Sequence, residues 1–381
     1  MNVLALKRFF HAIYIYFRRN DNVLLALSLV CAAVGFVLVY SATYSMSGAS
    51  KMIFVQAVAI LLGIVCMIVL SLIDYHVIAT FWKYIAIAAV LLLVATLVLG
   101  SGRDNVAEKS WIKFAGMSVQ PSEIVKIMFI ITFAKHIDIV KDKISRPMNV
   151  ALLLLHAAIP MVLILRQGDY GMTLVFAVIF IGMMFASNLK LRYFAGAGIL
   201  ALIAAPLLWA KLGSRQTGRI LALFSPSTFV KQSYQQIQSV SAIGSGEMWG
   251  YGLLHGPKTQ ASVASGLLPE KQNDMIFAVT GEELGFVGCV FIIVLLFALL
   301  IKILLTARAA KDMMGSMICV GVFTCFAFQM IANIGMCLFI SPVIGLTLPF
   351  MSYGGTSVLS SFLGVGLVLS VARKDLNLLF S

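Results

Sequence analysis

A glutamate and a lysine lie three residues apart inside a long apolar segment of the sequence. Residues 120–126 read QPSEIVK, so Glu123 and Lys126 share one face of a helix that begins at Pro121. Charged side chains in an apolar segment are costly unless they pair or line a hydrated cavity. Two interpretations follow, an ion pair that joins helices or a charged cavity that faces a substrate, and the second is favoured.

A further carboxylate, Asp274, ends the polar string LPEKQND at residues 268–274 and directly precedes another apolar run. An acid at such a position is either a helix cap or first-turn acid, or a side chain available as a general base. Glu282 and Glu283 follow about two helical turns later. We expect at least one of these two glutamates to be structural.

Two more polar strings open apolar runs in the same way. They read GDYG at residues 168–171 and PFMSYGGTS at residues 349–357. The glycines at 354 and 355 fit a kink, a close helix contact or an approach to a ligand, and the sequence does not separate these. Polar side chains from the strings are the candidate supporting residues: Gln120, Ser122, Asp169, Glu282, Ser352 and Tyr353.

The composition requires lipid, rather than water, around most of the chain. Of 381 residues, 61% are hydrophobic and 11% are charged, whereas a soluble domain carries roughly a quarter charged residues. The net charge of +13 lies mainly beside apolar runs, where anionic lipid and the positive-inside rule favour it. No nucleic-acid-binding motif accompanies this charge, so the sequence predicts membrane lipids and no nucleic acid as partners.

Apolar runs of near-helix length predict an all-α polytopic integral membrane protein with about ten transmembrane helices. They fall at residues 22–43, 51–73, 79–100, 119–137, 148–165, 171–188, 192–211, 276–306, 314–341 and 349–372. Basic short loops place both termini in the cytoplasm, with residues 1–21 and 373–381 as the cytoplasmic ends. Residues 213–273 then form a long extracytoplasmic loop between helices 7 and 8, which we expect to be structureless and functional.

The four polar strings open the fourth, sixth, eighth and tenth predicted helices. With the N-terminus inside, each of these helices starts at the outer face and runs inward. The sequence therefore predicts that the polar chemistry gathers on one side of the membrane, at the outer leaflet. Such a site suits an enzyme acting on a lipid-linked substrate, or a transporter.

The strings resemble those of the SEDS family (shape, elongation, division and sporulation), the RodA/FtsW group of bacterial peptidoglycan polymerases. The resemblance implies a single membrane domain over residues 1–381, in the bacterial cell membrane. The NIGM string at residues 333–336 and the PFMSYGGTS string look closer to RodA than to FtsW. The resemblance spans about residues 21–374 and is strongest at residues 120–126, 234–246, 268–288 and 349–357.

The resemblance implies a glycosyltransferase that moves a glycan strand from undecaprenyl pyrophosphate onto lipid II in cell-wall elongation or division. It implies a class B penicillin-binding protein as partner, and essential roles for Asp274 and for the Glu123–Lys126 pair. Asp274 is then the expected general base, and Lys126, Arg219 and Lys231 are candidate cations for the leaving pyrophosphate. No cofactor or metal-ligand cluster is evident, and a divalent cation at the pyrophosphate stays open.

Two other classes of function remain open from the residues alone. A lipid II flippase or transporter would carry charged residues through the membrane midplane to its inner half, and the sequence has few there. A non-enzymatic scaffold of the cell-wall synthesis complex would not need the carboxylates of the polar strings.

Overall fold

The computed structural model describes residue 18 and residues 20–102, 109–114, 117–211, 213–261 and 268–373. The predictions for the two basic termini lie largely outside this part of the chain, at residues 1–17 and 374–381. The helices run in the order α2 (Asn22–Thr43), α3 (Ala49–Leu72), α4 (Tyr75–Thr80), α5 (Trp82–Leu99), α6 (Pro121–Val140), the 3-10 turn η1 (Lys141–Lys143), α7 (Pro147–Arg166), α8 (Tyr170–Ala186), α9 (Leu191–Lys211), α10 (Ser214–Leu221), α11 (Val230–Ser245), α12 (Ile276–Ala309), α13 (Met313–Cys337) and α14 (Gly355–Ala372).

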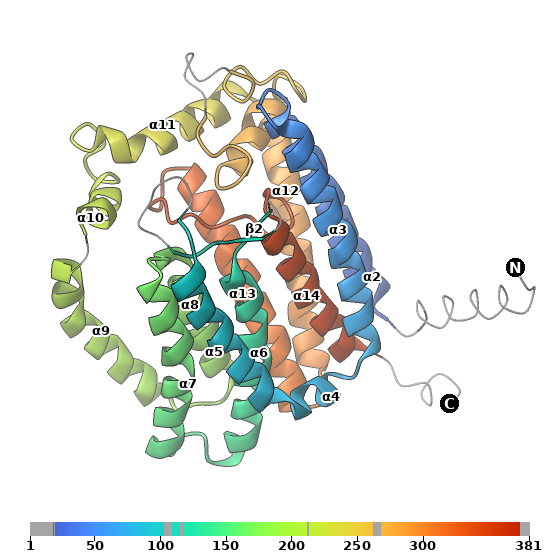
Figure 1. The fold of residues 1–381 in the computed structure, drawn as a ribbon, viewed down its shortest axis with the longest axis vertical. Coiled ribbons are helices and arrows are strands. Elements are labelled where there is room, and N and C mark those ends of the chain that lie inside the picture. Colours follow the sequence, from blue (N-terminus) through green and yellow to red (C-terminus); the bar gives the residue numbers. More distant parts are fainter. Residues whose placement is uncertain are drawn as a thin grey trace, which may run out of the picture.

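The all-α polytopic class is confirmed (Figure 1). Within the described residues, the only sheet is a hairpin in which β1 (Ile112–Phe114) pairs antiparallel with β2 (Met117–Val119). Each of the ten predicted spans coincides with a helix, and seven of these helices are long and apolar enough to cross a membrane. Helices α8 and α9 are shorter apolar helices, and α6 carries four charges, so the count of ten stays a prediction.

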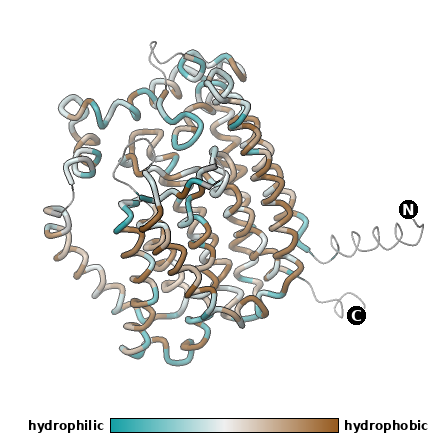
Figure 2. The backbone as a smooth tube through the Cα atoms, in the orientation of Figure 1, coloured by the Kyte–Doolittle hydropathy of each residue, from teal (hydrophilic) through white to brown (hydrophobic). Residues whose placement is uncertain are grey.

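The helices with the polar strings, α6, α8, α12 and α14, begin at the same end of the bundle (Figure 1). Main-chain and side-chain contacts join the four strings there. The Gln120 amide donates to Asp169, and the Tyr353 N–H donates to the Gln272 carbonyl at 2.7 Å. The prediction that the four strings gather on one side is therefore confirmed, and hydrophobic stretches of the same helices extend away from them (Figure 2).

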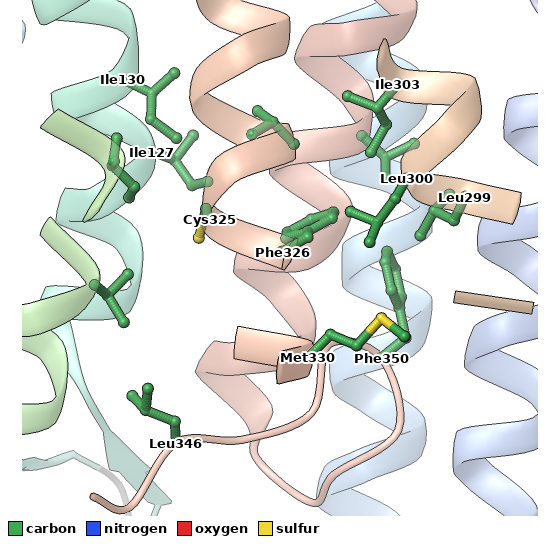
Figure 3. Packing of buried hydrophobic residues seen from close by; sticks show 14 of the residues in the cluster. Ile127, Ile130, Leu299, Leu300, Ile303, Cys325, Phe326, Met330, Leu346 and Phe350 are labelled. Carbon is green, nitrogen blue, oxygen red and sulfur yellow. The ribbon is translucent and has the colours of Figure 1, made fainter. Parts of the chain in front are cut away.

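The hydrophobic core lies where α12, α13 and α14 meet α6 and α3. Phe350, from the turn before α14, enters this core next to Phe326 of α13 (Figure 3). It packs edge-on against Phe326 and against Phe362 of α14, with centroid distances of 5.9 and 5.1 Å. Phe350 is 1% exposed and has a φ of 63°. Burying an aromatic ring outweighs the cost of this uncommon backbone conformation, and it fixes the turn that carries Ser352 and Tyr353.

The long segment between α9 and α12 is not structureless, which corrects the prediction for residues 213–273. Its described part contains α10 and α11. Helix α11 buries Gln236 and Ser239, whose side chains donate to the carbonyls of Met336, Ser341 and Cys337 at 2.8–3.0 Å. Met336 and Cys337 end α13, so their carbonyls have no partners within their own helix, and Ser341 lies in the turn that follows. Helix α11 therefore packs through a face of Gln and Ser side chains, although its polar sequence is typical of a loop.

Helix α12 is broken at Gly285, where φ is 67° and the backbone is not helical. The break exposes main-chain groups that the segment before it uses. Tyr251 and Gly252 donate to the carbonyls of Glu282 and Glu283 at 3.1 and 2.9 Å, while Phe286 donates to the Glu247 carbonyl at 2.8 Å. The segment 247–252 thus replaces the missing helical hydrogen bonds and locks the end of the long segment onto α12.

Candidate active site

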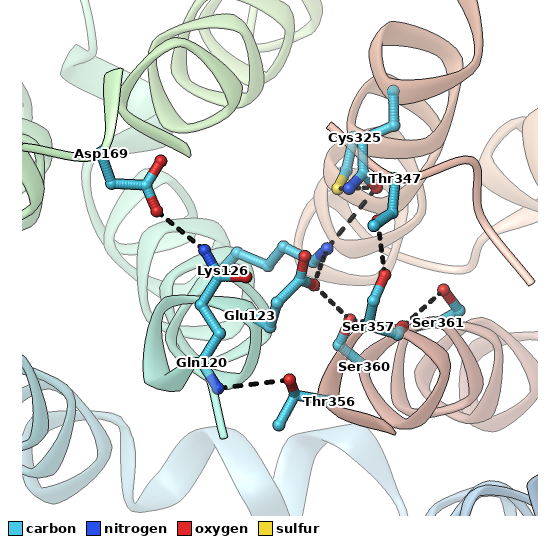
Figure 4. Close-up of polar contacts among 11 residues, drawn as sticks. Gln120, Glu123, Lys126, Asp169, Cys325, Thr347, Thr356, Ser357, Ser360 and Ser361 are labelled. Atoms are coloured by element: carbon cyan, nitrogen blue, oxygen red, sulfur yellow. Dashed lines mark hydrogen bonds and ion pairs between the residues drawn. The ribbon is translucent and has the colours of Figure 1, made fainter. Parts of the chain in front are cut away.

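Glu123 and Lys126 form a buried ion pair near the start of α6 (Figure 4). Lys126 is fully buried and Glu123 is 3% exposed. Ser360 of α14 donates to the Glu123 carboxylate at 2.8 Å, and the Lys126 ammonium donates to the side chain of Gln329 of α13 at 3.5 Å. The pair therefore joins three helices, and the contacts that it gains there offset part of the cost of burying both charges.

Gln120 and Asp169 connect the starts of α6 and α8. The Gln120 Nε2 donates to Asp169 Oδ2 at 2.8 Å, and the Gln120 N–H donates to Thr356 Oγ1 at 3.3 Å (Figure 4). The other oxygen of Asp169 caps α8 by accepting from the Met172 N–H at 2.9 Å. Asp169 is thus a helix cap whose second oxygen positions Gln120.

Three buried polar atoms of α6 and α13 have no hydrogen-bond partner within the described chain. They are the hydroxyl of Ser122, the amide nitrogen of Gln329 and the amide oxygen of Asn333. Ser122 is 1% exposed. Because buried polar atoms normally find partners, such a group of atoms is typical of a site that water or a ligand completes.

Asp274 lies half-buried one residue before the N-cap of α12, which is Met275. Its backbone carbonyl accepts from Asn333 Nδ2 at 2.9 Å, and the same nitrogen donates to the Leu346 carbonyl at 2.7 Å. The Asn333 amide of α13 thus fixes two main-chain segments, the one at Asp274 and the one at Leu346.

Asn333 and Gln329 lie on one face of α13, and this face contacts both Asp274 and Lys126. The two amides are four residues apart, one helical turn and about 6 Å of rise. The Lys126 ammonium contacts the Gln329 amide, and the Asp274 main chain contacts the Asn333 amide. Gly345, with a φ of 71°, borders Asp274, since a Cβ at this glycine would lie 3.6 Å from Asp274 Oδ2.

The glutamates of α12 hold the preceding loop. Both are fully buried. Glu282 accepts from the Lys258 N–H at 2.8 Å and from the N–H and hydroxyl of Thr259 at 2.7 and 2.6 Å. Glu283 accepts from Ser41 and, at 3.0 Å, from the Gln260 amide. The structure therefore gives Glu282 contacts to a loop, and none of these contacts is with the Glu123–Lys126 pair.

Lys271 is a buried cation that the sequence analysis did not single out. It is 1% exposed, and its ammonium donates to the Thr259 carbonyl and, at 3.1 Å, to Ser45 Oγ. Burial lowers the pKa of Lys271, while the charges of Glu283 and Glu282 act in the opposite direction. The available signal was its place in the LPEKQND string, three residues before Asp274.

The remaining candidates lie on the loops around this cluster. Arg219 of α10 donates to the Val343 carbonyl at 2.9 Å, on the loop that also carries Gly345. Ser352 accepts from the Leu348 N–H at 2.9 Å and so closes a turn. Lys231 is exposed in the first turn of α11, and no contact with the cluster is found for it among the described residues.

Three buried amides in the middle of helices were missed by the sequence analysis: Gln56, Gln329 and Asn333. Gln56 of α3 donates to the Ser352 carbonyl and accepts from the Gly354 N–H, each at 3.3 Å. It thereby fixes the turn before α14. A lone amide within an apolar run gives no pattern that distinguishes it from a helix-packing residue, so only the fold identifies these three.

Fold and site together define a multi-pass membrane protein with a buried ion pair and a half-buried aspartate at one end of its bundle. Residues 21–377 match the model of the FtsW/RodA/SpoVE family, described as cell cycle protein, and the chain belongs to this family. The "Probable peptidoglycan glycosyltransferase FtsW" of Trichlorobacter lovleyi is 32% identical over 92% of this chain and 93% of its own length.

A second relative, the "Peptidoglycan glycosyltransferase MrdB" of Escherichia coli strain K12, is 33% identical over 82% of this chain and 83% of its own length. A solved structure titled "Structural coordination of polymerization and crosslinking by a peptidoglycan synthase complex" contains a chain with the same fold. The TM-score is 0.78 at 27% identity, over 93% of this chain and 97% of the other. The two curated relatives have nearly equal identities, so the closer likeness to RodA stays a prediction.

Proposed function

We propose that this chain is a peptidoglycan glycosyltransferase in which Asp274 is the general base. The observation that carries the assignment is the placement of Asp274: the residue is half-buried, and Asn333 of α13 holds its main chain one turn from the amide that contacts Lys126. Relatives named as peptidoglycan glycosyltransferases match this chain over most of its length.

The proposed reaction is a single displacement. The 4-hydroxyl of the acceptor lipid II loses its proton to the Asp274 carboxylate while the oxygen attacks the anomeric carbon of the donor strand. The bond from that carbon to the undecaprenyl pyrophosphate breaks, and the pyrophosphate leaves with the electron pair. An α-linked donor gives a β-linked product by inversion, so no covalent nucleophile is required.

Lys126 supports this reaction through its charge. Its ammonium is fully buried and bonded to Glu123 and Gln329, so in this conformation it contributes a fixed positive charge rather than a direct phosphate contact. Arg219, which is half-buried and reaches the loop beside Gly345, is the better candidate for contact with the pyrophosphate. If a divalent cation binds here, the Asp274 carboxylate would be its available protein ligand and the ion would add positive charge for the leaving pyrophosphate; no group of three or more metal-ligating side chains is found among the described residues.

The proposed setting is the cell membrane, with both termini in the cytoplasm and the site at the outer leaflet. The short basic loops support this orientation. We expect a class B penicillin-binding protein as the partner that crosslinks the strands. The likeness to a chain from a peptidoglycan synthase complex supports a partner of this kind.

Polymerisation of labelled lipid II by the purified protein tests the proposal. Asp274→Asn keeps the size of the side chain and removes the base, so we expect polymer to fall by about 10²- to 10⁴-fold. Asp142→Asn, in the exposed turn η1, is the matched control and should polymerise like the wild type. Equal activity of the Asp274→Asn variant would exclude Asp274 as the base.

Two further assays separate the other classes of function. Vesicles in which the protein moves lipid II between leaflets without forming polymer would indicate a transporter. Full growth and normal shape of cells whose only copy carries Asp274→Asn would indicate a scaffold.

A further inference from the structure

A cavity of about 270 Å³ lies between α5, α6 and α7, with its polar residues away from the polar strings. Its walls are apolar apart from a short polar group at Thr132, His136 and His156. His136 is 13 residues after Glu123 on the same helix, or about 20 Å along α6. The polar group of the cavity is therefore separate from the candidate active site, whereas its apolar wall extends along α6 to Val125, next to Lys126.

The cavity opens toward the bilayer. Leu152, Leu155 and Ile159 of α7 line it and are 44%, 56% and 42% exposed, on a helix that crosses the membrane. Trp82, at the first residue of α5, lines it near the membrane boundary, where tryptophan is favoured. A molecule that enters this cavity comes from the lipid phase.

The polar group in the cavity forms a chain of hydrogen bonds. The Thr132 hydroxyl donates to the Phe129 carbonyl at 3.1 Å and lies 3.2 Å from Nε2 of His156. The two histidines face each other through their Nδ1 atoms at 3.0 Å. His136 also stacks on Trp82, at a centroid distance of 6.1 Å.

One pair of tautomers of the two neutral rings satisfies all of these contacts at once. Because the Thr132 hydroxyl donates to Phe129, it accepts from Nε2–H of His156, and Nδ1 of His156 is left bare. That nitrogen accepts from Nδ1–H of His136, so Nε2 of His136 ends the chain as an acceptor. No partner for this Nε2 is found within the described residues.

A second acceptor lies at the same cavity. Pro160 lines it from within α7 and has no N–H. The carbonyl of His156, four residues earlier, has therefore lost its usual helical donor. The polar end of the cavity offers acceptors, and it complements a molecule that brings a donor.

We propose that this cavity binds a neutral lipid whose polar end is a hydroxyl group. The hydrocarbon chain lies along the apolar walls, and the hydroxyl donates to Nε2 of His136. A long-chain alcohol and a diacylglycerol both carry such a hydroxyl group on an apolar body. A lipid that ends in a methyl ether lacks the donor and leaves the acceptor unpaired.

The probe that tests the site is a long-chain primary alcohol with a diazirine in its chain, added to the full-length protein in nanodiscs. Photolabelling followed by peptide mapping should place the label on α5, α6 and α7. The unlabelled alcohol should compete at least about fivefold better than its methyl ether, since a net hydrogen bond contributes a factor of this order. Diacylglycerol as a second competitor identifies which of the two sources binds.

Two variants keep the proposal falsifiable. Ala86→Phe fills the cavity and should abolish labelling, whereas Ala88→Phe on the exposed side of α5 should not. His136→Phe keeps the ring and should remove the preference for alcohol over ether. Labelling that persists in Ala86→Phe, or an ether that competes as well as the alcohol in the wild type, would overturn the proposal.

Discussion

At the scale of single residues, the Glu123–Lys126 pair affects both the stability of the fold and the proposed reaction. Removing one partner of a buried pair leaves an uncompensated charge, which costs about 3–5 kcal/mol of unfolding free energy. We therefore expect Glu123→Gln to unfold at a clearly lower temperature than the wild type, and Glu123→Gln/Lys126→Met to recover much of the loss. Thermal unfolding in detergent measures both.

The control for this prediction lies on the same helix. Lys135 and Asp138 are also three residues apart, at 3.2 Å, but they are 28% and 18% exposed. An exposed pair contributes about 0–1 kcal/mol, so Lys135→Met should shift the unfolding temperature little. If Glu123→Gln and Lys135→Met destabilise equally, the buried pair does not have the energetic role assigned to it.

Lys271 gives a prediction for the effect of pH on stability. Its pKa in the folded chain is lowered by burial below the ordinary value of 10.5. As the pH rises, the folded chain gives up this proton before the unfolded chain does, so stability increases between the two pKa values. The wild type should therefore gain stability relative to Lys271→Met as the pH approaches 10.5.

Unfolding temperatures of both proteins across a pH series measure this difference. The exposed Lys143→Met variant corrects for general effects of alkaline solution. A difference between wild type and Lys271→Met that falls as the pH rises would contradict the prediction.

At the scale of elements, the long segment between α9 and α12 is attached to the helix bundle at the break in α12. A Cβ at Gly285 would lie 2.6 Å from the Met248 carbonyl oxygen, and the φ of 67° disfavours any other residue. We expect Gly285→Ala to cost about 1–3 kcal/mol by straining the break and displacing the segment 247–252. Thermal unfolding measures the loss.

Gly196→Ala in α9 is the matched substitution, since a Cβ there meets nothing within 4 Å. In a helix, this change is neutral or stabilising by up to about 1 kcal/mol. Equal stability of the two variants would show that the break tolerates a side chain.

The elements also show what a sequence can specify. The span expected at residues 119–137 is α6, Pro121–Val140, because a proline start and an apolar run are local signals. Helix α11 was missed, because its buried face of Gln and Ser becomes favourable only against the end of α13. Gln329 and Asn333 were missed for the same reason: their roles depend on Lys126 and Asp274, which other segments supply.

At the scale of the whole molecule, the four polar strings lie at one end of the helix bundle. This end faces the outside of the cell only if the chain is oriented as its basic loops predict. Lys231 of α11 and Lys143 of η1 are exposed, and they lie beyond opposite ends of the membrane-spanning helices on that threading. Replaced singly by cysteine, they report the orientation through a membrane-impermeant maleimide applied to intact spheroplasts.

We expect Lys231→Cys to react in intact spheroplasts and Lys143→Cys to react only after the membrane is opened. Five of the six native cysteines are buried and Cys66 is half-buried, all within membrane helices, so the unchanged chain supplies the background. Labelling of Lys143→Cys in intact spheroplasts would show that the chain has the opposite orientation to the one proposed. A reversed chain would put Asp274 on the cytoplasmic side, where it could not extend strands in the outer leaflet, so this experiment tests the proposed reaction independently of catalysis.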